Sequence, residues 1–517
     1  MAGINRTTGK ATDLITFSRA SGGTALRKIS YGSELAPSLS TAIKVGDAAT
    51  TIAYNSGAGS LDIDAATTLD GAILLVSGVV VGRVYLFTAD ITLGTCTDSR
   101  ITVGPSFTNQ ARLQSSGTVS LVFTAEDTQI RIDSYADTGT FTINSISVKE
   151  VFFDQPDGTL TLFNHPTNIP RIEYDAAGNV KGLLIEEART NLVPYSSDFT
   201  NAAWGKTRSS ISSGEELAPD GNTATKLVED TTLAASHTLV YQYSSAPVST
   251  YTNSIFVKAA GRTNVRLAQT ISESFYADFS LSDGSYTAGP STTASSQYIG
   301  NGWYRLSITY TTTSIHNVAL VVYISTGTST TYDGDGTSGI YIYGAQLEAG
   351  SFPTSYIPTS GATATRAADI ASISVDNFGY NQKAGTLVVD YAAYIPQGRF
   401  AAAYGANGTN YIGVGYSNYS VYVQPLVGVM ATTSTFDGEF HKQGVTFDAR
   451  GASATKVSDN SVVEVSATGN LPALTDSDTL YIGTSPFAPN FIFSGHIKSI
   501  TYHPRRLSNA QLQALTA

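Results

Sequence analysis

Short segments in which apolar and polar residues alternate recur along most of this chain. Examples are VSLVFTA, TQIRIDSY, TFTINSISV, GIYIYGAQL, TLVVDYAAY and HIKSITYH. Successive side chains of a β-strand point to opposite faces of a sheet, so this period of two predicts strands with one buried face. Clusters of Gly, Asn, Asp and Ser separate the segments and predict tight turns. We therefore predict an all-β chain of tandem antiparallel β-sandwiches with very little helix.

Helical spacing is confined to the C-terminus. There Ser508 precedes NAQLQAL, with Gln511 three positions further on. A serine followed three positions later by glutamine is typical of a capping box, in which each side chain accepts a hydrogen bond from the other residue's backbone N–H. We predict one short helix at this place.

Length and composition limit the possible classes of protein. With 517 residues the chain is too long for one hydrophobic core, and roughly three or four domains are expected. The formal net charge of -11 would repel a phosphate backbone, so we expect no nucleic acid partner. The single cysteine, Cys96, excludes an internal disulfide and a thiolate metal cluster, and we predict that it is buried.

No segment has the pattern of a secretory signal or a membrane span. The first residues, MAGINRTTGKATDLITFSRAS, contain no apolar run of the kind that a secretory signal needs. The most apolar stretch is GAILLVSGVVV, from Gly71 to Val81. It is much shorter than the roughly 20 residues that cross a bilayer. We interpret it as two buried strands around a turn, and we expect no membrane insertion.

Four longer motifs follow one another between Ala188 and Ile370. They read ARTNLVPYSSDFTNAAWGK, YTNSIFVKAAGR, NGWYRLSIT and GIYIYGAQLEAGSFPTSYIPTSGATATRAADI. Their order and spacing resemble β-sandwich modules of the family 4/9/22 carbohydrate-binding type, as they occur in fibre and spike proteins of tailed bacteriophages. This resemblance implies a jelly roll at residues 189–372.

A lectin-like domain is expected after this module. AGTLVVDYAAY, FDGEFHKQGVTFDA, TLYIGTSPF and FSGHIKSITYHPRRLSNAQLQAL follow one another towards the C-terminus. They resemble the strands and the terminal helix of laminin-G-like, concanavalin A-like sandwiches. This second resemblance implies a lectin domain at residues 373–517.

The first part of the chain contains a weak copy of the module's strand order. VYLFTADITLGT, SSGTVSLVFTAEDTQIRI and GTFTINSISVKEV occur in the same order as YTNSIFVKAAGR, NGWYRLSITYTTT and GIYIYGAQLEAG. This repeat predicts another jelly roll at residues 25–152. In the phage proteins an ITFxRAS motif leads to a connector within a few residues. Here the connector begins only at Pro156, so the jelly roll is predicted to be an insertion.

Two short segments flank the predicted insertion. Residues 153–188 are expected to form a connector with a β-hairpin, because DAAG, from Asp175 to Gly178, is typical of a turn. We expect this hairpin to pack on the module that follows it. Residues 1–24 are too short, polar and rich in glycine to form a core. We expect them to be ordered only against a partner surface, as an anchor on a particle.

A search for catalytic motifs finds little. The chain contains no HExxH, GxSxG or GxxxxGK[ST] motif. The GxGxxG of Gly334, Gly336 and Gly339 leads into a predicted strand instead of a helix, so we interpret it as a turn. Glu186 and Glu187 are adjacent and would face opposite sides of a strand, which favours an ion pair and a solvated residue over an acid/base pair. We predict that the protein is not an enzyme.

One loop has oxygen ligands at a spacing that suits a metal. Asp333 and Asp335 lie there together with Thr337, and they could hold a structural calcium ion. The loop is not an EF-hand, because Gly344 takes the position where that motif has its bidentate glutamate. No other cofactor is expected.

Sugar binding requires aromatic faces flanked by polar groups. We name Tyr416, Asn418 and Tyr419, in the tyrosine-rich stretch YIGVGYSNYSVYV, and Trp204 as candidate glycan-binding residues. The alternative is that the tyrosines are ordinary residues of a sheet surface. The pattern of NGWYRL instead indicates that Trp303 belongs to a core.

The resemblance to phage proteins implies a structural virion protein, a fibre or spike at the particle surface that attaches noncovalently to host-surface glycans. It also implies contacts with other virion proteins through the N-terminus, an outward C-terminal domain and a homo-oligomer, a trimer in most such fibres. Two alternatives stay open. The chain could decorate a capsid or tail without binding a receptor, or it could be a polysaccharide depolymerase.

Overall fold

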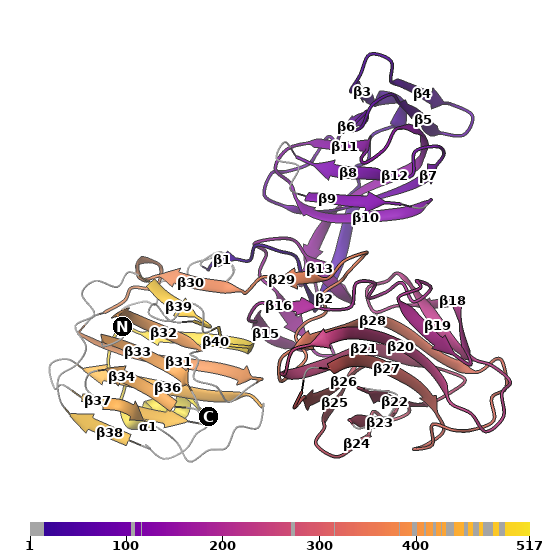
Figure 1. The fold of residues 1–517 in the computed structure, drawn as a ribbon. Coiled ribbons are helices and arrows are strands. Elements are labelled where there is room, and N and C mark those ends of the chain that lie inside the picture. Colours follow the sequence, from indigo (N-terminus) through magenta and orange to yellow (C-terminus); the bar gives the residue numbers. More distant parts are fainter. Residues whose placement is uncertain are drawn as a thin grey trace. The chain divides into compact units, whose positions relative to one another are not determined.

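The structure is a computed structural model. It describes residues 15–104, 109–114, 116–269, 275–314, 316–381, 383–394, 401–407, 410–416, 420–424, 427–430, 439–448, 453–458, 465–468, 479–484 and 492–517. Antiparallel strands form nearly all of the regular structure in these residues, which confirms the all-β prediction (Figure 1). Contacts divide the chain into two compact units. One consists of residues 27–160 and 164–166, and the other contains residues 1–26, 161–163 and 167–517.

The smaller unit is a β-sandwich, which we call the inserted sandwich. One sheet has the order β10-β7-β12-β2-β13, with β4 and β5 added beside β12, and the other has the order β3-β6-β11-β8-β9. Alternate side chains of both sheets, such as Phe87, Ile132 and Phe141, form its core. The first sheet contains β2 (Gly23–Glu34), β4 (Thr51–Asn55), β5 (Ser60–Ala65), β7 (Val84–Leu93), β10 (Gly117–Thr124), β12 (Gly139–Phe153) and β13 (Thr159–His165). The second contains β3 (Ile43–Val45), β6 (Gly71–Leu75), β8 (Ser99–Val103), β9 (Asn109–Leu113) and β11 (Gln129–Ser134).

The chain enters and leaves the inserted sandwich on neighbouring strands. Ile29 of β2 is the register partner of Phe153 of β12. One residue beyond this pair, the Asp154 N–H donates a hydrogen bond to the Lys28 carbonyl at 2.9 Å. Because the two ends of this sandwich are adjacent, it could be added to a chain without separating the residues on either side.

Two expectations for this sandwich can be compared with the structure. Cys96 is fully buried and unpaired, as predicted. The apolar stretch from residue 71 to 81 forms only one strand, β6, and then a turn. The turn exposes Val80 and Val81 by 46% and 64%. The prediction of two buried strands was therefore wrong for the second half of the stretch, because Gly78 and Gly82 adopt positive φ and interrupt it.

The second sandwich, which we call the central sandwich, contains strands from all four motifs of the resemblance. Its sheets have the orders β17-β20-β27-β22-β23-β24 and β18-β19-β28-β21-β26-β25. YTNSIFVKAA, WYRLSITYT and GIYIYGAQLEA form β21, β26 and β28 of one sheet. The strand bounds are β17 (Trp204–Thr207), β18 (Ser209–Leu217), β19 (Thr223–Glu229), β20 (His237–Ala246), β21 (Thr250–Ala260), β22 (Asn264–Ala268), β23 (Tyr276–Ser280), β24 (Tyr286–Ala288), β25 (Thr293–Gly300), β26 (Trp303–Thr311), β27 (His316–Ser325) and β28 (Gly339–Ala349).

The third sandwich, at the C-terminal end, is also built of two sheets. Their orders are β1-β30-β39-β32-β33-β34-β35 and β14-β15-β40-β31-β36-β37-β38. The first sheet contains β1 (Thr16–Ser18), β30 (Ile370–Ser374), β32 (Ala402–Asn407), β33 (Asn410–Tyr416), β34 (Ser420–Gln424), β35 (Val427–Met430) and β39 (Thr479–Ile482). The second contains β14 (Ile172–Tyr174), β15 (Val180–Ile185), β31 (Ala384–Ala393), β36 (His441–Asp448), β37 (Ser453–Ser458), β38 (Val465–Thr468) and β40 (Gly495–His503). The predicted helix is α1 (Asn509–Leu515), and Ser508 and Gln511 form its capping box.

Strands from the start and the middle of the chain complete this C-terminal sandwich. In Figure 1 indigo β1 lies beside orange β30, and the register pairs Phe17 with Ala371. Residues 15–24 are therefore ordered against the chain itself, which corrects our expectation that they need a partner surface. The hairpin around Asp175 forms as predicted, but its strand β15 pairs with β40 through Leu184 and His496. It thus extends the C-terminal sandwich, and Glu186 after β15 also binds Ser355 of the next module in sequence.

The predicted start of the C-terminal domain at residue 373 falls inside strand β30 and would cut it. The core of the C-terminal sandwich includes Leu183 and Ile185 of the hairpin. In the described residues no helix is long and apolar enough to span a membrane.

Candidate functional site

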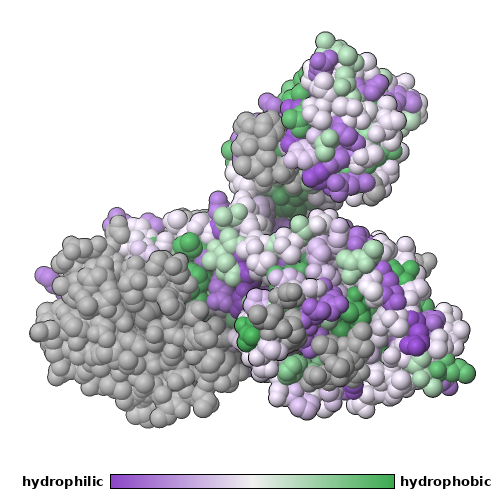
Figure 2. All heavy atoms as spheres, in the orientation of Figure 1, coloured by the Kyte–Doolittle hydropathy of each residue, from purple (hydrophilic) through white to green (hydrophobic). Residues whose placement is uncertain are grey.

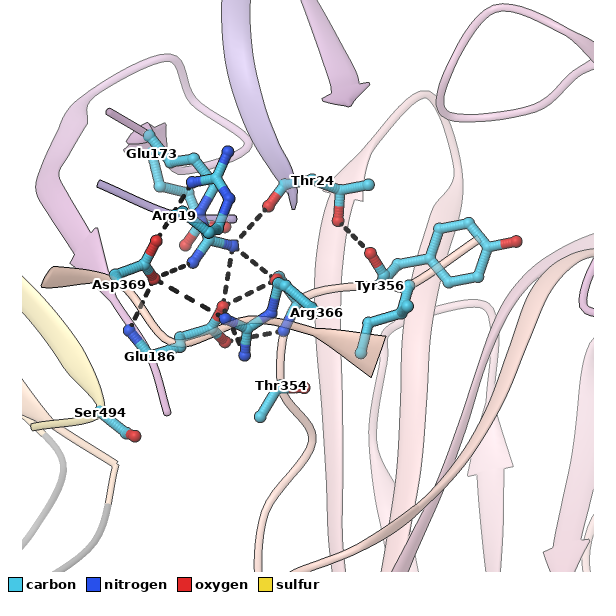
Figure 3. A network of polar contacts seen from close by, with 12 residues as sticks. Arg19, Thr24, Glu173, Glu186, Thr354, Tyr356, Arg366, Asp369 and Ser494 are labelled. Atoms are coloured by element: carbon cyan, nitrogen blue, oxygen red, sulfur yellow. Dashed lines mark hydrogen bonds and ion pairs between the residues drawn. The ribbon is translucent and has the colours of Figure 1, made fainter. Parts of the chain in front are cut away.

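Five charged residues from the sequence motifs meet in one buried cluster (Figure 3). Arg19 follows β1, Arg171 precedes β14, and Glu186 follows β15. Arg366 is the last residue of β29 (Ala364–Arg366), which pairs with β16 (Arg189–Asn191), and Asp369 precedes β30. None of the five is more than 1% exposed. We call these residues the charge cluster.

The two carboxylates of the charge cluster each bind more than one cation. Asp369 accepts hydrogen bonds from Arg19 Nη1 at 3.1 Å, from Arg171 Nη2 and from the backbone N–H of Glu186 at 2.9 Å. Glu186 Oε2 lies 2.8 Å from Arg171 Nη1 and 3.5 Å from Arg366 Nη2. Arg171 therefore links both acids, and its own side chain is fully buried.

Hydrogen bonds connect the charge cluster to the segment that follows β28. Ser355 donates to Glu186 from its backbone N–H and from its hydroxyl, both at 2.7 Å. Arg171 Nη1 donates to the carbonyl of Thr24 at 3.0 Å, and the Thr24 hydroxyl donates to the Tyr356 carbonyl at 2.6 Å. The N-terminal segment, the hairpin and the PTSYIPT segment are thus held through one set of contacts.

Glu186 and Arg19 of the charge cluster are both ionised at neutral pH. Burial is the largest influence on Glu186 and opposes its charge, but Arg366, Arg171 and the hydrogen bonds from Ser355 outweigh it and lower its pKa to about 2. Burial, together with repulsion from Arg171, lowers the pKa of Arg19 to about 10, against the attraction of Asp369. At neutral pH Glu186 is therefore an anion and Arg19 a cation.

A second polar contact joins the hairpin to strand β40. His496 Nε2 of β40 lies 2.6 Å from Glu173 Oε2 of β14, and Lys181 Nζ approaches the same oxygen at 2.8 Å. Burial is the main cause that lowers the pKa of His496, although Glu173 acts in the opposite direction. The Glu173 carboxylate accepts this hydrogen bond from the Nε2–H of His496. This pair binds the hairpin to the C-terminal sandwich a second time.

The charge cluster is not arranged for glycoside hydrolysis. That reaction needs a carboxyl group with a raised pKa that can protonate a leaving group in a cleft open to the sugar. Glu186 has a lowered pKa, and it is closed off from solvent. Its neighbour Glu187 pairs with Arg189, as expected for an ion pair at the edge of a core. The expected solvated residue is absent from this pair of glutamates, because Glu186 is buried in the charge cluster. The chemistry of this cluster is structural: it fixes the elements around it.

The structure contradicts our prediction that Trp204 stacks on a sugar. Its side chain is 2% exposed and packs against the rings of Phe199 and Tyr241, with centroids 5.0 and 5.7 Å away. The indole N–H donates to the Tyr195 carbonyl at 2.9 Å. Trp204 thus fills the end of the central sandwich core and leaves no ring face for a ligand. Trp303 is buried as well, as predicted.

The remaining candidates are placed as follows. Asn418 and Tyr419 lie outside the described residues, and of Tyr416 only the backbone, the last position of β33, is described.

In the loop predicted to hold calcium, both aspartates accept hydrogen bonds from the backbone. Asp335 accepts them from the N–H groups of Thr337 and Ser338, and Asp333 accepts one from the N–H of Ala234. Within the described part of the chain no three His, Cys, Asp or Glu side chains are close enough to hold a metal. The turn that contains Gly336 forms as predicted, with a φ of 75°.

Sequence reasoning missed the charge cluster, although it named Glu186. A signal was present: charged residues make up only 14% of this chain, and Arg19, Arg171, Arg366 and Asp369 each lie in a motif of the resemblance or next to one. A charged residue is almost never fully buried unless it is paired, so a charge within a motif of buried strands indicates a specific partner.

Comparisons with known proteins return weak structural similarities. No protein-family model and no curated protein matches the chain. Among solved structures it is similar to the CBM40 module of Ruminococcus gnavus IT-sialidase, with 13% identity over 26% of this chain and 83% of that one, and a TM-score of 0.23. It is also similar to the CBM22-1-CBM22-2 tandem of Paenibacillus barcinonensis Xyn10C, with 10% identity over 62% and 98%, and a TM-score of 0.23. Domains LG4-5 of the mouse laminin alpha1 chain match with 11% identity over 65% and 94%, and a TM-score of 0.19. At these scores the similarities do not bear on function.

Proposed function

We propose that this chain is a structural protein of a tailed-phage or related particle, a fibre or spike that attaches noncovalently to host-surface glycans. The observation that carries the proposal is the charge cluster. Three segments named by the resemblance supply these residues: the ITFxRAS motif supplies Arg19, the connector supplies Arg171 and Glu186, and the motif that ends in TRAADI supplies Arg366 and Asp369. We call the charge cluster, together with the segments that it connects, the joint. The motifs are thus explained by their contribution to this joint, not by a catalytic or ligand site.

A rigid joint suits an adhesion fibre. Moving one element away would break at least one of these buried ion pairs, which costs about 3–5 kcal/mol. The joint therefore holds the N-terminal segment, the hairpin and the C-terminal sandwich in one arrangement. A fibre must transmit force between its attached end and its binding end, and rigid joints serve that purpose.

Exposed tyrosines offer surfaces for sugars. In the central sandwich Tyr286 of β24 and Tyr298 of β25 are 48% and 47% exposed. Tyrosine supplies a flat contact surface and a hydroxyl at low entropic cost. Single sites of this kind bind weakly, and several copies on one particle, as in a trimer, would raise the avidity.

The proposal is tested with labelled full-length protein on bacterial cells and on purified bacterial surface polysaccharides. We expect saturable binding to one class of polysaccharide without release of reducing ends. Antibody labelling in electron micrographs of the particle should place the protein on its surface. Binding to no polysaccharide and no cell, or steady shortening of the polysaccharide, would refute the proposal.

A further inference from the structure

The inserted sandwich has a row of arginines on the outer face of one sheet. Ile101, Ile130 and Ile132 of β8 and β11 point into the core, so the residues that alternate with them lie on the opposite face. Arg100 of β8, Arg112 of β9 and Arg131 of β11 lie on that face. Figure 1 draws β8, β9 and β11 on the near side of this sandwich, and Figure 2 shows hydrophilic residues gathered there.

Two buried aspartates hold these arginines in place. Asp133 accepts from Arg100 Nε at 3.1 Å and Nη2 at 3.0 Å, and it also lies 2.7 Å from Arg131 Nε. Asp98 binds Arg112 through Nε at 3.1 Å and through Nη2. The side chains of Asp98 and Asp133 are 7% and 0% exposed. The carboxylates therefore lie beneath the surface and the guanidinium groups lie above them.

The arginines are also oriented by an aromatic ring. The guanidinium carbons of Arg100 and Arg112 lie 4.8 and 4.3 Å from the ring centroid of Tyr135. Each forked ion pair uses Nε and one Nη nitrogen, so the N–H groups of the second Nη lie outside these pairs. The Arg112 side chain is 41% exposed, so its guanidinium group reaches solvent.

This arrangement is not the most stable one for an isolated sheet. Arg100 and Arg112 are direct register partners on neighbouring strands, and like charges in that position destabilise a sheet. The row contains three cations and two anions, in a chain whose net charge is -11. Across from Arg131 in the register, the buried hydroxyl of Thr102 has no hydrogen-bond partner in the described residues. One anion added at this face would relieve the repulsion.

We infer that the face around Arg100 and Arg112 is a subsite for a carboxylate-bearing sugar. The inference rests on the proposed function and specifies the glycan class: an acidic polysaccharide instead of a neutral one. A planar carboxylate matches the paired N–H groups of guanidinium in distance and direction. Because the aspartates have already oriented the arginines, little side-chain freedom is lost on binding.

The test measures binding of the full-length protein to a hyaluronan octasaccharide, in which every second sugar is glucuronate. Chitohexaose, a neutral oligosaccharide, is the matched ligand without carboxylates. Arg112→Gln removes the exposed guanidinium, and Arg112→Lys retains the charge without the planar fork. Arg83→Gln is the matched control, because Arg83 lies on the same sandwich, has a 55% exposed side chain and forms a surface pair with Glu150. Thermal unfolding checks that all three variants are folded.

We expect the wild type and Arg83→Gln to bind the octasaccharide equally and chitohexaose not at all at this face. Arg112→Gln should weaken octasaccharide binding about tenfold or more, and Arg112→Lys by less. Equal binding by Arg112→Gln and Arg83→Gln, or no binding by the wild type, overturns the inference. Full displacement by inorganic phosphate also overturns it, because the face would then be a general oxyanion site. Cell attachment that persists in Arg112→Gln leaves the proposed function intact, so the two can fail separately.

Discussion

Arg171 and Asp369 are 198 positions apart in the sequence, and their side chains form an ion pair without solvent exposure. Arg171 comes from the segment before the hairpin, and Asp369 from the segment that leads into β30. The pair joins two elements of the C-terminal sandwich, and Arg171 also reaches Ser355, which follows the central sandwich. The elements that meet at this pair are expected to unfold together.

We predict that Asp369→Asn strongly destabilises the larger unit. The substitution retains the shape of the side chain but leaves Arg19 and Arg171 without their shared anion. Loss of one partner from a buried pair costs about 3–5 kcal/mol. Denaturant unfolding measures this loss. Arg83→Gln, which breaks an exposed pair, should cost no more than about 1 kcal/mol. Similar small losses in both variants would contradict a structural role for the charge cluster.

The charge cluster should also make stability depend on acid. The pKa of Glu186 falls from an ordinary 4.5 to about 2 in the folded protein. An acid with a lowered folded pKa stabilises the fold fully above its unfolded pKa, and this contribution is lost as pH falls towards the folded value. The difference in unfolding free energy between the wild type and Glu186→Gln should therefore shrink between about pH 4.5 and pH 2. A difference that stays constant over this range would show that Glu186 is not ionised in the fold.

Trp204 should matter for folding and not directly for sugar binding. Because its ring is buried against Phe199 and Tyr241, Trp204→Ala is expected to cost about 3–5 kcal/mol of unfolding free energy. Tyr298→Ala, at a half-exposed position where the ring packs on Tyr304, should cost only about 1 kcal/mol. Thermal unfolding of the two variants gives the comparison. If Trp204→Ala abolished glycan binding at unchanged stability, our assignment of this residue to the core would be wrong.

The C-terminal segment should not fold when it is produced alone. Residues 373–517 lack β1, β14 and β15, and they cut β30. They also lack Leu183 and Ile185 of the core. Expression of this segment should therefore give a product that is rapidly degraded by protease and shows no cooperative unfolding, in contrast to the full chain. Cooperative unfolding of the isolated segment would mean that the added strands are dispensable.

Local patterns were sufficient to predict much of this fold. Alternation of apolar and polar residues identified the strands of all three sandwiches, because the pleat of a strand sends successive side chains to opposite faces. The capping box of α1 depends on only four consecutive residues, so it could be predicted from Ser508 and Gln511. The core position of Trp303 followed from the same alternation.

Depth within a core was less predictable than the presence of a strand. Trp204 lies at the start of a strand, where alternation has no earlier strand position to extend from, and only the ring contacts with Phe199 and Tyr241 show that it is buried. The stretch from Gly71 to Val81 is apolar throughout, yet Val80 and Val81 are exposed because glycines at positive φ place them in a turn.

What the sequence by itself determined is therefore local: strand pattern, turns, the helix cap and the order of the motifs. Only the tertiary structure decided which distant segments pair, because strand pairing depends on the closure of the whole chain and not on the sequence within either strand. Thr16 pairs with Ser372, and Leu184 with His496, only because folding brings strands from distant parts of the chain into the same sandwich. The charge cluster was also decided by the tertiary structure, because an arginine in a short motif forms its ion pair only with an acid that folding brings next to it.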